Sequence, residues 1–99
     1  MKEFDFVDIY EWLHDANRAL IGGNLSREEV EIILAGDIYL LHHLSNSFEH
    51  NVKECIKTHN FTLRAFYLLH RRPKTEKNLE LISRLAMDTW FFIEKLLDD

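Results

Sequence analysis

The sequence predicts an all-α fold, a compact bundle of four or five helices that form a single domain. Apolar residues recur at helical spacing along almost the whole chain, whereas no sustained alternation and no Asn-Gly turn indicates a β-hairpin. Three glycines and one proline leave long segments uninterrupted. With 99 residues, 46% of them hydrophobic and 29% charged, the chain has the size and composition of one globular domain.

The first helix is expected over residues 6–21, with apolar side chains on one side and charged side chains on the other, namely Asp8, Glu11, Asp15 and Arg18. Asp5 is a suitable N-cap for it. Gly22 and Gly23 should end the helix, because glycine accepts the left-handed conformation that follows many helix C-termini. The expected apolar side holds Phe6, Ile9, Tyr10, Trp12, Leu13, Ala16 and Leu20.

The second helix, expected over residues 26–36, has the clearest start signal in the chain. Ser26 and Glu29 match a capping box, and the flanking Leu25 and Val30 can pack together as a hydrophobic staple. We expect the helix to end or bend at Gly36. The sequence also leaves open a continuation through this glycine, at roughly 1 kcal/mol relative to alanine.

A third helix is expected over residues 37–58 and a fourth over residues 61–72. Asn60 is the residue that should interrupt or cap the segment between them. Pro73 then closes the fourth helix, because a proline disfavours the helical conformation of the residue before it.

The last helix is expected over residues 76–97, with Thr75 as its N-cap. Its apolar side covers nearly half of the circumference, which is wider than a two-helix seam requires. Phe91 falls outside this apolar side, where it indicates either a contact beyond the monomer or a single exposed apolar residue. The surplus apolar surface favours a homodimer.

The net charge of −5 is unevenly distributed along the chain. Residues 1–37 carry three basic and nine acidic side chains, whereas residues 38–77 carry seven basic and three acidic ones. The overall acidity argues against a dedicated duplex-DNA binder, which is expected to be basic. The basic middle is either a local anion site or, as we favour, a complement to the acidic ends within the fold or across a dimer.

The sequence predicts a cytoplasmic protein without a membrane span. No apolar segment approaches about 20 residues, and the N-terminal residues turn acidic at once, unlike a signal peptide. Cys55 is the only cysteine, so an intramolecular disulfide is excluded. Because Cys55 falls on an apolar helix side, we expect a buried, inert thiol.

Six histidines raise the question of a metal site. His43 and His50 lie seven residues apart, a helical rise of about 10.5 Å, which is too long for both to bind one ion. His50 and Glu54 give only two ligands. Glu11 and His14 lack the second Glu-x-x-His element that ferritin-like bundles use. We therefore expect no metal, no cofactor and no complete catalytic set.

Residues 41–46, Leu-His-His-Leu-Ser-Asn, resemble the phosphoacceptor helix of histidine phosphotransfer proteins, whose signature is His-x-Leu-Lys-Gly. The resemblance implies a small helical bundle in which the free ring nitrogen of His42 attacks an acyl-phosphate. Ser45 stands where that family has lysine, and Asn46 stands where it has glycine. The alternative interpretation of His42 is a solvated helix histidine.

Arg64 and His70 have the spacing of the Arg-x(four to six)-His element of HEPN ribonucleases, which this segment resembles. Members of that family are small, all-helical and usually dimeric, and two copies of the motif act on the RNA phosphate and the 2′-OH. The resemblance implies an RNA-cleaving or RNA-binding dimer. Here the interior of the motif is apolar, whereas a polar residue commonly follows the arginine.

Arg64, Tyr67 and Arg71 share one helix face, and Arg72 extends its positive charge. An arginine beside an aromatic ring can bind a carboxylate, a phosphate or a single-stranded base. We favour a protein carboxylate over nucleic acid because the chain as a whole is acidic. These residues, and Phe91 on the last helix, are the expected partner-binding residues.

The favoured function is that of a small non-catalytic interaction or regulatory protein, such as an inhibitor, an antitoxin-like factor or an adaptor. Small size, acidity, surplus apolar helix surface and the lack of a complete catalytic set motivate this hypothesis. An acidic binding protein suits a basic partner through charge steering. The HEPN-like ribonuclease and the phosphotransfer protein are the enzymatic alternatives.

Overall fold

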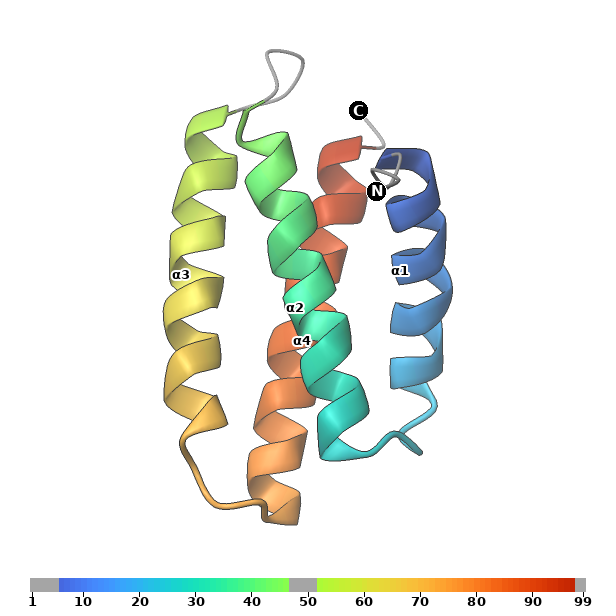
Figure 1. The fold of residues 1–99 in the computed structure, drawn as a ribbon, viewed down its shortest axis with the longest axis vertical. Helices are drawn as coiled ribbons and strands as arrows, with labels where there is room; N and C mark the ends of the chain where they lie inside the picture. The colour runs from blue at the N-terminus through green and yellow to red at the C-terminus, as the bar shows by residue number, and fades with distance from the viewer. Residues whose placement is uncertain (1–5, 47–51, 98–99) are drawn as a thin grey trace, which may run out of the picture.

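The computed structural model describes residues 6–46 and 52–97, and these form four α-helices and no strand (Figure 1). The predicted all-α bundle of four or five helices is confirmed. The helices are α1 (Phe6–Ile21), α2 (Arg27–Leu44), α3 (Val52–His70) and α4 (Glu76–Leu97).

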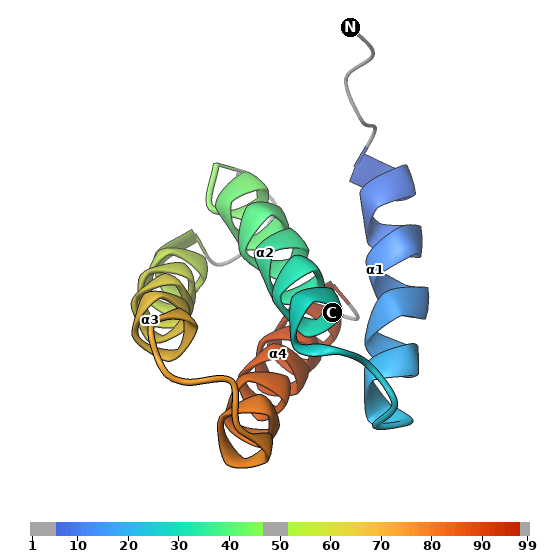
Figure 2. The ribbon, with the colours of Figure 1, turned by 60° about the horizontal axis from the view of Figure 1, so that its bottom comes forward.

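Helices α2 and α4 pack against each other in the middle of the bundle, with α1 on one side of this pair and α3 on the other (Figures 1 and 2). Successive helices run in opposite directions. Within the described part of the chain, α1 and α3 each contact both middle helices but do not contact each other. The outward faces of α1 and α3 are therefore turned to opposite sides of the molecule.

The predicted helix ends that depend on strong local signals are confirmed. The Ser26 backbone N–H donates to Glu29 Oε1 at 3.1 Å, and the Glu29 backbone N–H donates to Ser26 Oγ at 3.2 Å, which completes the capping box. Gly23, after α1, has a φ of 76°, in the left-handed region that favours glycine. Thr75 Oγ1 accepts a hydrogen bond from the Asn78 backbone N–H at 3.2 Å, as an N-cap does.

Replacing Ser26 with alanine should lower the free energy of unfolding by about 1 kcal/mol, because the Glu29 N–H loses its side-chain acceptor. Urea denaturation of both proteins measures this loss. Ser83→Ala, inside α4, is the control and should cause no loss, because alanine is the better residue in a helix interior. Equal losses in both variants would show that the cap does not stabilise α2.

The predicted boundary between helices 26–36 and 37–58 is wrong, because α2 continues through Gly36 and Asp37 to Leu44. The glycine serves the packing of α1 instead of ending a helix. A Cβ atom at Gly36 would lie 2.7 Å from Leu13 Cδ2 and 3.0 Å from Trp12 Cζ3. Both helices approach each other closely only because this residue has no side chain.

The predicted helix 37–58 and the interruption at Asn60 before helix 61–72 are also wrong. Helix α3 runs without a break from Val52 to His70, and the chain leaves α2 at Leu44. There, Ser45 Oγ donates to the Leu41 carbonyl at 2.8 Å and Asn46 Nδ2 donates to the His42 carbonyl at 3.1 Å. The Leu41 carbonyl also accepts from the Ser45 backbone N–H at 2.9 Å, so the two side chains add hydrogen bonds to carbonyls in the last turn of the helix. The interpretations of Asp5 and His50 lie outside the described residues.

The core consists of two apolar clusters stacked along the bundle. The Trp90 cluster contains Leu13, Leu40, Leu41, Leu44, Cys55, Trp90 and Ile93. The Val30 cluster contains Leu20, Val30, Leu34, Ile38, Ile82 and Ala86. Leu25 packs against the Val30 cluster, as expected of its part in the hydrophobic staple.

A polar layer lies at the boundary between the two clusters. Each described helix contributes a buried polar residue to it, and along each helix this residue stands between side chains that belong to or pack against the two clusters. Asn17 Nδ2 of α1 donates to Asp37 Oδ1 of α2 at 3.0 Å, and the hydroxyls of Thr62 in α3 and Thr89 in α4 lie 3.4 Å apart. Buried polar groups of this kind fix which helix faces meet, because other alignments leave them without partners.

Candidate functional site

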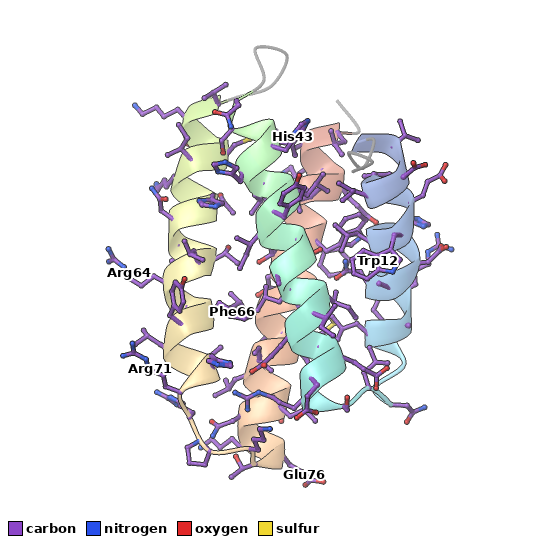
Figure 3. The ribbon with its side chains drawn as sticks, in the orientation of Figure 1. Trp12, His43, Arg64, Phe66, Arg71 and Glu76 are labelled. Atoms are coloured by element: carbon purple, nitrogen blue, oxygen red, sulfur yellow. The ribbon has the colours of Figure 1, made fainter. Side chains whose placement is uncertain are left out.

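An apolar groove runs between α1 and α2 on the outside of the bundle. It has a volume of about 570 Å³ and is lined by Asp8, Ile9, Trp12, Gly36 and Tyr39. Trp12 and Tyr39 are 50% and 55% exposed, although both are large aromatic residues. Figure 3 shows Trp12 between α1 and α2. We refer to this feature as the α1/α2 groove.

The groove depends on one glycine, Gly36, and on apolar residues that recur at helical spacing along α1 and α2. At Gly36 the two helices lie close together, because Leu13 and Trp12 of α1 occupy the space that a side chain would take, and the rings of Trp12 and Tyr39 line the groove beside this contact. Ile32 lies two turns before Tyr39 on the same face of α2 and is 58% exposed. Exposed aromatic and aliphatic side chains that gather around one groove are typical of a binding surface.

One acidic side chain, Asp8, lines the groove on α1, and Glu11 and Asp15 lie further round this helix in a separate shallow depression. Asp8, Glu11 and Asp15 follow one another at spacings of three and four residues, and all three are exposed. This spacing places them on the outward face of α1, next to the side that carries Trp12. A cationic partner would therefore meet negative charge before it reaches the apolar floor.

The outward face of α3 has the opposite charge. Lys57, Arg64 and Arg71 are exposed and seven residues apart, so they form a line along the helix. Arg64, Tyr67 and Arg71, which the sequence analysis grouped, line one shallow surface depression of about 560 Å³ together with Asn60, Leu63 and Leu68. In Figure 3 the side chains of Arg64 and Arg71 point away from the bundle. We refer to this face as the α3 stripe.

Two other expected partner-binding residues lie outside the α3 stripe. Arg72 is exposed in the turn after α3, where its backbone N–H donates to the Leu69 carbonyl. Phe91 is 54% exposed on α4 and lines neither the α1/α2 groove nor the depression on α3. The five expected residues therefore lie on more than one surface of the molecule.

Arg64 and His70 point in different directions within the chain. The His70 ring stacks on Phe66 at 5.9 Å between centroids, and its Nδ1 lies 3.1 Å from Glu31 Oε1 of α2. Glu31 also accepts from Arg27 Nε at 3.0 Å. Partial burial favours the neutral form of Glu31, but the hydrogen bonds from His70 and Arg27 hold its pKa below the usual value. His70 therefore connects α3 to α2 within the same chain.

His42 is exposed on α2, and its ring centroid lies 5.5 Å from that of His59 in α3. Among the residues that the structure describes, no group of three or more histidine, cysteine, aspartate or glutamate side chains is arranged to hold a metal ion. Cys55 is buried as expected, and burial followed by the charge of Glu54 raises the pKa of its thiol. No described helix is long and apolar enough to cross a bilayer.

The buried Asn17–Asp37 pair was not predicted from the sequence. Burial raises the pKa of Asp37 to about 8, although the hydrogen bond from Asn17 lowers it. Asp37 Oδ2 and Asn17 Oδ1 have no hydrogen-bond partner among the described residues. The available signal was that Asp37 shares a helical face with Leu34 and Leu41, but this signal exists only if α2 continues past Gly36.

The chain matches no protein-family model, no curated protein and no solved structure.

Proposed function

We propose that the protein is a non-catalytic binding protein whose α1/α2 groove receives an amphipathic helix from a basic protein partner. The observation that carries this proposal is the pair of half-exposed aromatic rings, Trp12 and Tyr39, that line one apolar groove together with Ile9 and Gly36. Aromatic side chains in such grooves contribute most of the binding free energy in many interfaces.

The shape and the chemistry of the groove support a helix as its occupant. Two packed helices border it, and its lining is apolar apart from Asp8 at one edge. An amphipathic helix presents an apolar stripe of comparable form, with anchors every three or four residues. Such a partner helix would bury Trp12 and Tyr39 without leaving its own backbone polar groups unsatisfied, because they are bonded within the helix.

The charges around the groove support a basic partner. Asp8, Glu11 and Asp15 lie on the α1 side, and the whole chain carries a net charge of −5. Complementary charge raises the association rate and selects among partners, and both effects weaken as salt screens the charges. The inhibitor, antitoxin-like and adaptor roles all follow from covering such a partner surface.

Truncating Trp12 to alanine is expected to weaken binding of a basic amphipathic helix at least about tenfold, because loss of an aromatic anchor commonly costs more than about 1.4 kcal/mol. The probe is a leucine/lysine helical peptide, compared with a leucine/glutamate peptide of the same pattern and with a scrambled leucine/lysine peptide. Isothermal titration calorimetry gives the affinities, and amide NMR shifts identify the contacted residues.

Phe91→Ala is the matched control, since Phe91 is as exposed as Trp12 but lies on α4. Binding of the basic peptide that depends on Trp12 and not on Phe91 supports the proposal. Equal binding of the three peptides, or a loss caused by Phe91→Ala alone, contradicts it. A lysate pull-down with the wild type and Trp12→Ala then selects natural partners that need the groove.

A further inference from the structure

The two outward faces of this molecule are complementary to each other. The outward face of α1 carries three acidic side chains, Asp8, Glu11 and Asp15, and one basic side chain, Arg18. The α3 stripe carries Lys57, Arg64 and Arg71. Because α1 and α3 lie on opposite sides of the α2–α4 pair and do not touch, they cannot satisfy each other within one chain (Figure 2).

The charges on α1 and α3 match each other in spacing as well as being opposite in sign. Asp8 and Asp15 are seven residues apart, and so are Arg64 and Arg71. Seven residues rise about 10.5 Å along a helix, so two helices that lie side by side can bring both pairs together at once. A neighbouring molecule's α3 therefore offers two cations to two carboxylates on α1.

The apolar parts of the two faces match in the same arrangement. The α3 stripe carries Phe61, Tyr67 and Leu68, which are 67%, 57% and 60% exposed. These side chains flank the line of cations, as Trp12 and Tyr39 lie beside the line of acids on α1. The α3 stripe thus has the character that we propose for a ligand of the α1/α2 groove, a basic helix with apolar anchors.

We propose that the α1/α2 groove of one molecule binds the α3 stripe of a second copy of this chain. Pairing of two identical faces is disfavoured, because it would place acid against acid or base against base. This inference rests on the proposed function in one respect, since both assign a basic helix to the same groove. Its added content is that the protein supplies such a helix itself.

Association of this kind joins two different surfaces, so it gives a ring or an open chain and not a two-fold dimer. It also covers the groove and therefore competes with a partner helix. Exposed ion pairs each contribute little, so the contact is weak and salt-dependent. Self-association would keep the groove closed at high protein concentration and open at low concentration.

The test uses the full chain in analytical ultracentrifugation over a concentration series at low and high salt (about 50 and about 500 mM NaCl). The wild type should gain mass with concentration at low salt and lose this gain at high salt. Arg64→Glu/Arg71→Glu and Asp8→Lys/Asp15→Lys should each remain monomeric. An equimolar mixture of the two variants should associate again, because the reversed faces are complementary.

Arg84→Glu/Lys95→Glu is the matched control for the arginine variant, with the same change of net charge at exposed positions of α4. It should associate like the wild type. Thermal unfolding checks that every variant is folded. A wild type that is monomeric throughout, a mixture that does not associate, or a loss of association in the α4 control would each overturn the inference.

The failure of this inference can be told apart from the failure of the proposed function. Arg64→Glu/Arg71→Glu leaves the α1/α2 groove intact and should still bind the leucine/lysine peptide. Peptide binding without self-association overturns only the inference. If the protein self-associates through these charges but does not bind the peptide, only the proposed function is overturned, because it assigns basic helices in general to the groove.

Discussion

Replacing Asp37 with asparagine is expected to raise the free energy of unfolding at pH 8 by roughly 3 kcal/mol, because folding of the wild type requires its carboxyl to keep, up to about pH 8, a proton that the unfolded chain has released. Asp37 is fully buried, and its only hydrogen-bond partner among the described residues is Asn17. Ionising a carboxyl group there leaves a buried charge without a cation. Asparagine has the same shape, keeps the oxygen that accepts from Asn17 Nδ2, and carries no charge.

The sign of the pH dependence follows from the raised pKa of Asp37. This pKa is about 8 in the folded state, against 3.8 for the free side chain. Between these values the folded state holds a proton that the unfolded state has released, so stability falls as pH rises from about 4 to about 8. A pKa difference of one between the folded and unfolded states corresponds to about 1.4 kcal/mol. The expected effect of roughly 3 kcal/mol is therefore smaller than the full pKa difference of Asp37 would give.

Urea denaturation of the wild type and Asp37→Asn at pH 5, 6.5 and 8 measures this effect. The two proteins should differ least at pH 5 and most at pH 8. Asp88→Asn, at an exposed position of α4, is the control and should change stability little at any of these pH values. Parallel pH profiles for the wild type and Asp37→Asn would show that Asp37 is already ionised in the folded protein.

The helices with strong terminal signals could be predicted from the sequence because those signals are local. Ser26 and Glu29 meet within one helical turn, and the bounds predicted for the first and last helices agree with α1 and α4. The α2 and α3 boundaries failed for the opposite reason. By its intrinsic propensity Gly36 should break a helix. A glycine is needed there because any larger side chain would overlap Leu13, which lies 23 positions earlier in the chain.

The candidate site, like the helix boundaries, could be predicted from the sequence only in part. The spacing of Arg64, Tyr67 and Arg71 on one helix predicted that they share a surface, and they do. The α1/α2 groove was missed because Trp12 falls on the apolar side of α1 and was interpreted as a core residue. Its exposure depends on where α2 crosses α1, which no single-helix pattern contains.

Gly36→Val is expected to lower the free energy of unfolding by about 2 kcal/mol, or the melting temperature by about 8 to 16 °C. The valine Cβ would already lie 2.7 Å from Leu13 Cδ2, and Leu13 is fully buried in the Trp90 cluster. The core is close-packed, so α1 has to move away from α2. The gain in helix propensity over glycine, a few tenths of a kcal/mol, is too small to offset this.

Ala35→Val separates steric overlap from a general effect of valine in a helix. Ala35 precedes Gly36 in α2 but is exposed, so its replacement should cost less than about 1 kcal/mol. In a Leu13→Ala background the cost of Gly36→Val should shrink by at least about 1 kcal/mol, because the atom that valine meets has been removed. Equal costs at positions 35 and 36, or an unchanged cost without the Leu13 side chain, would contradict the close approach of α1 and α2. The same displacement of α1 should separate Trp12 from Tyr39, so Gly36→Val is also expected to weaken any helix that binds between them.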